Sequence, residues 1–268
     1  MNKLFIFFLF TISLFSKSVA SEFLDLEDNF FPEGIAVSKN GDLYVGSLKE
    51  NKIIKFRNKK KTSEIFVPSN SNDINSVIGI IVDDRNKILW ACSSNPGVSN
   101  YPSDKIVSLK AFDLNSGEHL QSYPFPNGGF CNDITIDSND NIYVTDSFNP
   151  RILRLNKSQG RLETWFENDL FVGDGFNLNG ITYIDNKIYT VKMNSGELFS
   201  IEIEKNGKPI NFKKIDLPRS LNAPDGIEVI DKNNLLVVEN RTKDSWTGSL
   251  TKINLNSPIQ MEVLIDNL

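Results

Sequence analysis

The chain has 268 residues, a net charge of −5 with both signs mixed along it, a single histidine and two cysteines. Without a basic face it lacks the main mark of a nucleic-acid-binding protein. The two cysteines and His119 are too few for a tetrahedral zinc site of thiolates and imidazoles. No G-x-S-x-G nucleophile motif is present, and we interpret His119 as a surface residue.

The first twenty residues have the pattern of a secretory signal peptide. Lys3 supplies a short positive region, residues 4–15 are almost entirely apolar, and Ser18-Val19-Ala20 fits a small-x-small cleavage site. A membrane anchor is the alternative, but the apolar run is too short to span a bilayer. We therefore expect residues 1–20 to be removed and the mature protein to be secreted or periplasmic, without a membrane span.

A two-strand pattern then recurs five times along the chain. The copies are EGIAVSKNGDLYVG from Glu33, IGIIVDDRNKILWAC from Ile78, NDITIDSNDNIYVTD from Asn132, NGITYIDNKIYTV from Asn179 and DGIEVIDKNNLLVVE from Asp225. Their first positions are 45 to 54 residues apart, a period that indicates structural repeats or propeller blades.

Further strand-like segments lie between the copies. KIIKF, RILRL, LFSIEI and SLTKINL each follow a copy, and SEIFV, LETWF and MEVLI come next. No segment has a helical period. Four short strands per repeat predict an all-β fold, a β-propeller formed as a single domain by residues 21–268. Five blades are visible, so the protein is either five-bladed or, as we favour, a six-bladed parent lacking most of its last blade.

Equivalent positions of successive inner strands form a ring around a propeller axis. Here the ring positions are Glu33, Ile78, Asn132, Asn179 and Asp225, and four of the five carry a side-chain oxygen. Two carboxylates and two amides suit a hard divalent cation, calcium above magnesium. Ordinary Asn-Gly and Asp-Gly turn chemistry is the alternative, but it explains neither Glu33 nor the shared phase.

A second circle of residues lies fourteen positions after the ring residues. It contains Asp146 and Glu239, which either orient ring amides or contact substrate, or else face solvent at strand ends. Cys92 and Cys131 fall at the same end of adjacent blades. In an exported protein they form a disulfide or remain buried thiols.

The stretches PEG, CNDITIDSNDNIYVTDS, NGI and APDGIEV resemble the SMP-30/gluconolactonase/LRE-like family of six-bladed propeller hydrolases, over most of the mature chain. The resemblance implies a Ca²⁺ ion, or another divalent metal such as Zn²⁺, Mn²⁺ or Mg²⁺, held by Glu33, Asn179 and Asp225, with Asn132 as a ligand or close neighbour. It further implies Asp225 and Asn132 as catalytic residues, with Asp133 beside the ligands.

The resemblance implies hydrolysis of lactones, esters or organophosphates, so we expect a metal-dependent lactonase or esterase. Sugar-lactonase members resemble RPND before the third ring residue, whereas this chain has Phe130-Cys131-Asn132-Asp133, without that arginine. A more apolar lactone or ester is therefore expected. The alternative function is a non-catalytic binding module with a structural calcium. A strictosidine-synthase-like propeller is disfavoured, because that group does not need a complete oxygen ring.

Overall fold

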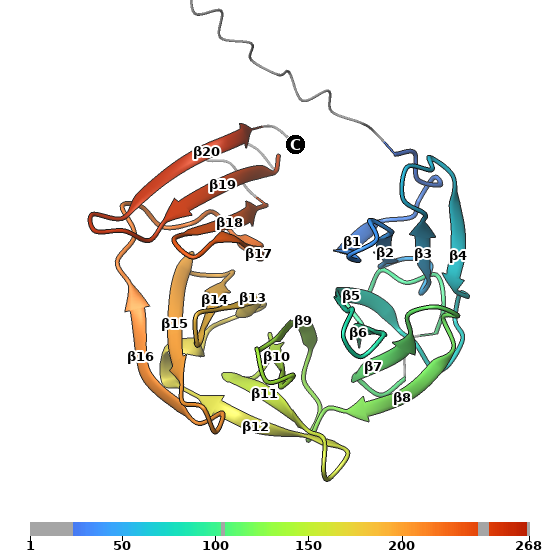
Figure 1. Cartoon of the computed structure of the whole chain (residues 1–268), viewed down its shortest axis with the longest axis horizontal. Helices are drawn as coiled ribbons and strands as arrows, with labels where there is room; N and C mark the ends of the chain where they lie inside the picture. Colours follow the sequence, from blue (N-terminus) through green and yellow to red (C-terminus); the bar gives the residue numbers. More distant parts are fainter. Residues whose placement is uncertain (1–23, 103–104, 241–246, 267–268) are drawn as a thin grey trace, which may run out of the picture.

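The computed structural model describes residues 24–102, 105–240 and 247–266. Within these residues, twenty strands form five four-stranded antiparallel sheets arranged as blades around a common axis (Figure 1). In each blade the strands follow one another in chain order, with the first strand innermost. The predicted all-β propeller is therefore confirmed, as a five-bladed ring.

The first strand of each blade carries a ring position, and the other three strands lie progressively further out. The strands of blades 1 and 2 are β1 (Pro32–Val37), β2 (Leu43–Ser47), β3 (Ile53–Phe56), β4 (Ser63–Val67), β5 (Ser76–Asp83), β6 (Ile88–Ser94), β7 (Ser108–Asp113) and β8 (His119–Pro124). Blade 3 contains β9 (Cys131–Ile136), β10 (Ile142–Asp146), β11 (Arg151–Asn156) and β12 (Arg161–Glu167).

Blades 4 and 5 follow a one-turn 3₁₀ helix, η1 (Asp169–Phe171). Their strands are β13 (Leu178–Ile184), β14 (Lys187–Lys192), β15 (Glu197–Ile203), β16 (Pro209–Ile215), β17 (Pro224–Asp231), β18 (Asn234–Glu239), β19 (Ser249–Asn254) and β20 (Gln260–Asp266). The outer-strand segments predicted from the sequence all fall on strands. Among the described residues, no helix is long and apolar enough to cross a membrane.

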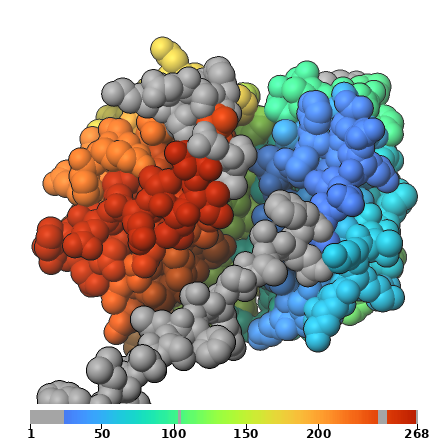
Figure 2. Space-filling model, turned by 90° about the horizontal axis from the view of Figure 1, so that it is seen from above, coloured from blue at the N-terminus to red at the C-terminus, as the bar shows by residue number. Residues whose placement is uncertain are grey.

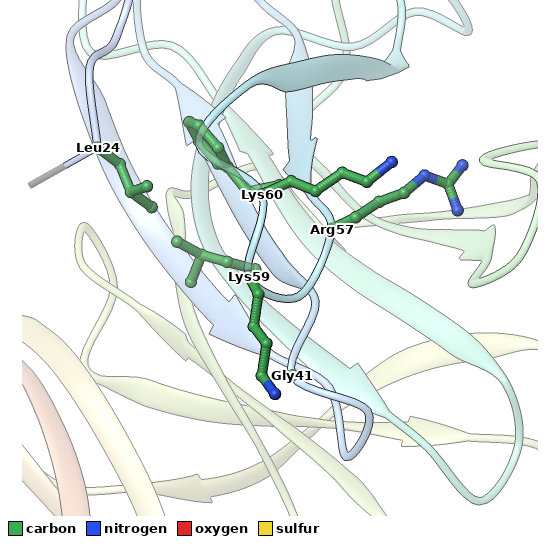
Figure 3. Close-up of a pocket in the computed structure, with 7 residues that line it drawn as sticks. Leu24, Gly41, Arg57, Lys59 and Lys60 are labelled. Carbon is green, nitrogen blue, oxygen red and sulfur yellow. The ribbon is translucent and has the colours of Figure 1, made fainter. Parts of the chain in front are cut away.

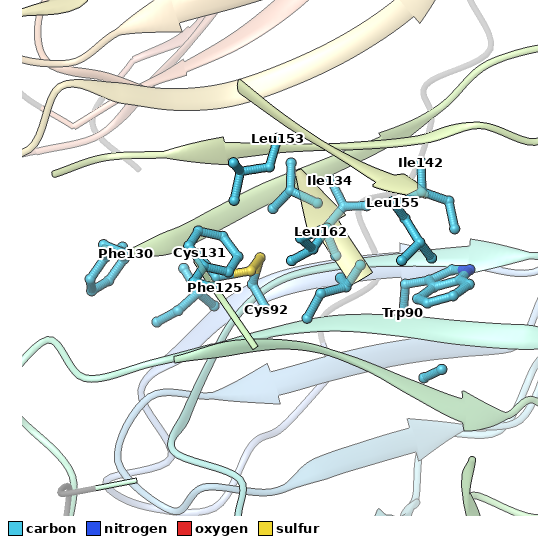
Figure 4. Close-up of a cluster of buried hydrophobic side chains, with 14 residues drawn as sticks. Trp90, Cys92, Phe125, Phe130, Cys131, Ile134, Ile142, Leu153, Leu155 and Leu162 are labelled. Atoms are coloured by element: carbon cyan, nitrogen blue, oxygen red, sulfur yellow. A yellow bond between two sulfur atoms is a disulfide. The ribbon is translucent and has the colours of Figure 1, made fainter. Parts of the chain in front are cut away.

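The hydrophobic core is divided among the interfaces between successive blades. One cluster joins blades 2 and 3, and it contains Trp90, Cys92, Phe130, Cys131 and Leu153 among others (Figure 4). Similar clusters join blades 1 and 2, blades 3 and 4, and blades 4 and 5. Because strand side chains alternate between the two faces of a sheet, blades 2, 3 and 4 each contribute one face to the cluster before them and the other face to the cluster after them.

A disulfide between Cys92 and Cys131 crosses the interface of blades 2 and 3, so the predicted pairing is confirmed. Both residues are completely buried. Structural disulfides are typical of proteins outside the cytoplasm. The bond therefore supports the expected extracytoplasmic location, whereas the predicted signal peptide at residues 1–20 lies outside the described residues.

The ring is open between blade 5 and blade 1. The inner strands pack in the order β1, β5, β9, β13 and β17, and no comparable packing joins β17 back to β1 in the described part of the chain. Figure 2 shows blade 5 and blade 1 on opposite sides of a cleft. On β1, Ile35 and Val37 are each 63% exposed, although the residues equivalent to Ile35 in the other blades are buried and those equivalent to Val37 are partly buried. A sixth blade in this opening remains our proposal.

One local prediction is wrong. His119 was expected to be a surface residue, but it is the first residue of β8 and is half-buried. Its ring packs edge-on against Phe112, and its Nε2 atom is hydrogen-bonded to the Ser122 hydroxyl at 2.9 Å. The apolar neighbour on β7 explains the burial, since the opposite strand offers a surface for the imidazole ring.

Candidate metal and catalytic site

The five ring positions lie near the starts of the innermost strands β1, β5, β9, β13 and β17, at the same end of each. In every blade, the ring residue and the residue after it interrupt the pairing with the second strand. In blade 3, for example, Cys131 pairs with Asp146 and Ile134 with Val144, leaving two residues opposite one. These are β-bulges, which re-aim side chains and are common beside active sites.

Glycines beside the ring residues let adjacent inner strands approach closely. A Cβ atom on Gly79 would lie 2.6 Å from the Asn132 carbonyl oxygen, and one on Gly180 would lie 2.7 Å from the Ile227 nitrogen. Neither glycine has a positive φ. These glycines are therefore not needed for a left-handed backbone turn, and their function is to make room for the next blade.

The charges of Glu33 and Asp225 interact at the axis, although their strands, β1 and β17, belong to the first and last blades. Burial first, and then the negative charges of Asp225 and Asp133, raise the pKa of Glu33 well above its usual value. Burial also raises the pKa of Asp225, against hydrogen bonds from Asn240 and Asn179 that lower it. The fold thus brings together the two carboxylates that the repeat alignment placed in one ring.

The ring amides are held by neighbouring polar groups. Asn132 and Asn179 are both 4% exposed. The Asn132 Nδ2 atom donates to the Ser147 hydroxyl at 2.8 Å, and Asn179 is hydrogen-bonded to Asp225 and lies with its Nδ2 atom 3.5 Å from the Met193 sulfur. With the amide N–H groups directed to these partners, the amide carbonyl oxygens remain for a ligand.

Two residues that fix the ring were missed by the sequence analysis. Ser147 holds Asn132, and the Asn240 Nδ2 atom donates to the Asp225 Oδ2 atom at 2.5 Å. Both lie fifteen positions after the ring residue they contact. The sequence repeat could have identified these two residues, because a polar residue directly follows both Asp146 and Glu239.

Asp133 takes the position that glycine occupies in the other four blades, and its side chain bridges blades 3 and 4. Its Oδ2 atom accepts from the Ile181 N–H at 3.0 Å. Burial raises the pKa of Asp133 to about 7, against the backbone hydrogen bonds from Ile181 and Ile134, and the charges of Glu228 and Asp225 add to the increase. A position beside the metal ligands remains our proposal for this carboxylate.

Asp146 and Glu239 are completely buried, so the alternative in which they face solvent is wrong. The Asp146 Oδ2 atom accepts from Arg151 Nε at 2.9 Å, and its Oδ1 atom accepts the N–H groups of Phe130 and Phe148. Glu239 forms a two-point ion pair with Arg219. Their hydrogen-bond partners are arginines, loop N–H groups and the Thr251 hydroxyl rather than ring amides, which makes both carboxylates supports of the loops around the site.

The ring residues fit a hard cation in their chemistry. They offer two carboxylates and two amide oxygens, the ligand types that calcium prefers. The charge of Asp225 adds to the raised pKa of Glu33, and a cation between the two carboxylates would offset that cost. Across the described residues there is no cluster of three or more His, Cys, Asp or Glu side chains arranged for a metal. A site here therefore depends on the amides of Asn132 and Asn179.

A separate pocket on blade 1 has different chemistry (Figure 3). It is lined by Leu24, Gly41, Leu43, Phe56, Arg57, Lys59 and Lys60. Its basic residues belong to the turn between β3 and β4. It offers cations and apolar carbon rather than oxygen ligands, and Arg57 is already paired with Glu64. The pocket is thus no candidate for a metal site.

Comparisons with known proteins support the fold. Residues 19–49 match the model of a family described as strictosidine synthase-like, N-terminal. No curated protein matches the chain. Similar solved structures include a chain of a nidogen–laminin complex, with 15% identity and a TM-score of 0.66 over 89% of this chain and 80% of that chain. A virginiamycin B lyase from Staphylococcus aureus shows 16% identity and a TM-score of 0.57, over 87% of this chain and 84% of that one.

A gluconolactonase from Xanthomonas campestris shows 14% identity and a TM-score of 0.61, over 87% of this chain and 76% of that one. The chain is a β-propeller that shares its fold with these proteins. At such identities the likeness concerns the fold alone. The family match covers only the segment around Glu33, and it falls on the group that the sequence analysis ranked below the lactonases.

Proposed function

We propose that the protein is an exported, metal-dependent hydrolase of lactones or related esters. The observation that carries the proposal is the convergence of Glu33, Asp225 and Asn179 at the propeller axis, where burial raises the pKa of both carboxylates and the charge of Asp225 adds to the increase at Glu33. An arrangement of this kind is costly for stability alone, and costly groups of perturbed pKa cluster at functional sites.

In this proposal Glu33, Asn132, Asn179 and Asp225 hold a divalent cation, most suitably calcium. When bound, the cation supplies Lewis acidity toward a carbonyl or phosphoryl oxygen. Four oxygen ligands without nitrogen or sulfur favour calcium over zinc. Manganese and magnesium accept the same ligand types, so the choice among these ions is part of the test.

Asp225 is the carboxylate that we propose as general base or nucleophile. Asn240 holds its Oδ2 atom, and Asn179 contacts the same carboxylate, so its orientation is fixed from two sides. A raised pKa makes a carboxylate a stronger base near neutral pH, which suits proton removal from water. Asn132, held by Ser147, keeps its amide carbonyl toward the axis, where it positions the substrate or the cation.

The test is a panel of lactones and aryl esters, assayed with calcium and with EDTA. Asp225→Asn is expected to lower kcat by at least about a hundredfold, as for loss of a general base. Asp231→Asn on the same strand is the matched control, because this exposed aspartate lies at the far end of β17. Equal activity of wild type and Asp225→Asn would refute the assigned role.

The second candidate is a non-catalytic binding module in which a cation only fastens the blades. The similar fold of a chain from a nidogen–laminin complex favours it, since that structure contains two proteins bound together. Thermal stabilisation by calcium with no turnover of any substrate would select this reading. Absence of calcium stabilisation in wild type, and no difference in Glu33→Gln, would refute the cation site itself.

A further inference from the structure

Three phenylalanines meet at the end of the propeller where the ring residues lie. The ring centroids of Phe130 and Phe148 are 5.0 Å apart, those of Phe130 and Phe176 are 5.0 Å apart, and those of Phe148 and Phe176 are 5.2 Å apart. Phe130 directly precedes β9, Phe148 follows the end of β10, and Phe176 precedes β13. All three therefore lie beside the starts of the strands that carry Asn132 and Asn179.

Hydrogen bonds connect this aromatic cluster to the ring. Ser147, the neighbour of Phe148, accepts from Asn132 and donates to the Leu178 carbonyl at 2.6 Å. The buried Asp146 accepts the N–H groups of Phe130 at 2.9 Å and Phe148 at 3.1 Å. These hydrogen bonds are made by backbone N–H groups and by Ser147, so they place the three rings beside the groups that hold Asn132 without involving the rings themselves.

The cluster exposes apolar surface that its own packing does not use. Phe130 is only 3% exposed, whereas Phe148 is 51% exposed and Phe176 is half-buried. Aromatic rings bury large apolar areas when they find a partner, so an exposed ring stacked on two others is a ready contact surface for a ligand.

The cationic side chain near the cluster, Arg151 at the start of β11, is already hydrogen-bonded within the protein. The Arg151 guanidinium donates from Nε to Asp146 and from its Nη2 atom to the carbonyl oxygens of Pro126 and Gly128, at 2.8 Å in both cases. With those donors committed and the residue only 9% exposed, we do not expect it to bind a carboxylate or a phosphate of a ligand. The surface near Asn132 therefore favours uncharged carbon.

We propose that the aromatic cluster of Phe130, Phe148 and Phe176 binds the alkyl or aryl group of the substrate while its carbonyl lies at the ring. The substrate class is thus an apolar lactone or ester rather than a sugar-acid lactone. This inference rests on the proposed hydrolase function, whose failure is distinguished by a binding measurement that needs no turnover.

The test compares wild type, Phe148→Ala and Leu120→Ala. Leu120, on the outer strand β8, is also 51% exposed and serves as the matched control. With calcium present, hydrolysis of γ-butyrolactone and of γ-nonalactone, which adds a pentyl chain, is measured by proton release. We expect Phe148→Ala to raise KM for γ-nonalactone about fivefold, with less than a twofold change for γ-butyrolactone. Leu120→Ala should change neither value, and Phe148→Leu should recover part of the loss.

Binding of 2-pentylcyclopentanone, a ketone that cannot be hydrolysed, is followed in parallel by saturation-transfer NMR. If wild type hydrolyses lactones and Phe148→Ala leaves both the KM ratio and the ketone signal unchanged, the aromatic cluster is not the subsite, although the hydrolase proposal stands. If no lactone is hydrolysed but the ketone signal disappears only in Phe148→Ala, the subsite stands and the hydrolase proposal fails. Loss of both signals in Leu120→Ala would also overturn the inference.

Discussion

Replacement of two equivalent glycines by alanine tests the open ring directly. Gly180 and Gly226 hold the same position in blades 4 and 5, directly after a ring residue. A Cβ on Gly180 meets the backbone of β17, at 2.7 Å from the Ile227 nitrogen and at a closer contact with the Asp225 carbonyl oxygen. Among the described residues, a Cβ on Gly226 meets no atom within 4 Å. The described structure therefore predicts opposite outcomes for the same substitution.

The magnitudes follow from these contacts. At Gly180 the obstructing atoms are backbone, so β13 and β17 must separate, and overpacking of this kind costs about 3 kcal/mol. In a domain of this size, a loss of about 3 kcal/mol lowers Tm by about 6 to 12 °C. At Gly226, where φ is not positive, alanine only reduces the conformational freedom of the unfolded chain and stabilises by about 0.4 to 1 kcal/mol.

Thermal unfolding followed by circular dichroism measures both variants, and Gly79→Ala serves as a second obstructed position, since its Cβ would lie 2.6 Å from the Asn132 carbonyl oxygen. Equal losses at Gly180 and Gly226 would refute the open ring, because some backbone would then have to pass over Gly226. Our proposal of a sixth blade makes the complementary prediction. In a polypeptide that carries such a blade, Gly226→Ala becomes as costly as Gly180→Ala.

Three further predictions concern stability. Joint replacement of Cys92 and Cys131 by alanine should lower the free energy of unfolding by up to about 4 kcal/mol, because the disulfide links residues 39 apart in sequence; an unchanged urea midpoint would count against this. Burial opposes ionisation of Glu239, but hydrogen bonds from a guanidinium, a hydroxyl and a backbone N–H outweigh it and hold the pKa below its usual 4.5. Its stabilisation is thus present above pH 4.5 and is lost as pH falls, and Glu239→Gln should flatten the acid limb of a Tm–pH profile. Burial raises the pKa of Asp133 from 3.8 to about 7, so in EDTA stability should fall as pH rises between these values, and Asp133→Asn should reduce that slope, leaving the part that Glu33 and Asp225 contribute.

The strand pattern could be predicted because each inner and second strand repeats the same apolar phase. The repeat alignment also placed Glu33, Asn132, Asn179 and Asp225 at one level of the axis, since equivalent positions of blades must form a ring. It could not show that the ring stays open beside Glu33. That depends on packing between β17 and β1, which no local pattern encodes.

The ion pairs around the loops could be predicted only in part from the sequence. Asp146 and Arg151 lie directly opposite one another on β10 and β11. A cross-strand pair of opposite charges is readable from a short hairpin, and the stretch from Asp146 to Arg151 has that form. Arg219, in contrast, reaches Glu239 from the segment before β17. Twenty residues separate these partners, and only the folded loop brings them together.

The residues that contact the ring lie fifteen positions after the ring residues, not fourteen as the second circle predicted, and the reason is geometric. In an antiparallel pair, directly opposite side chains share one face of the sheet. Asp146 lies opposite Cys131, and Glu239 lies opposite Pro224, the residues just before the ring positions. Successive side chains alternate faces, so the next residue along, Ser147 or Asn240, has the direction that reaches the ring. The bulge in each inner strand shifts its pairing with the second strand by one residue. A sequence repeat shows the spacing of residues, but it does not show which of them a bulge has turned toward the axis.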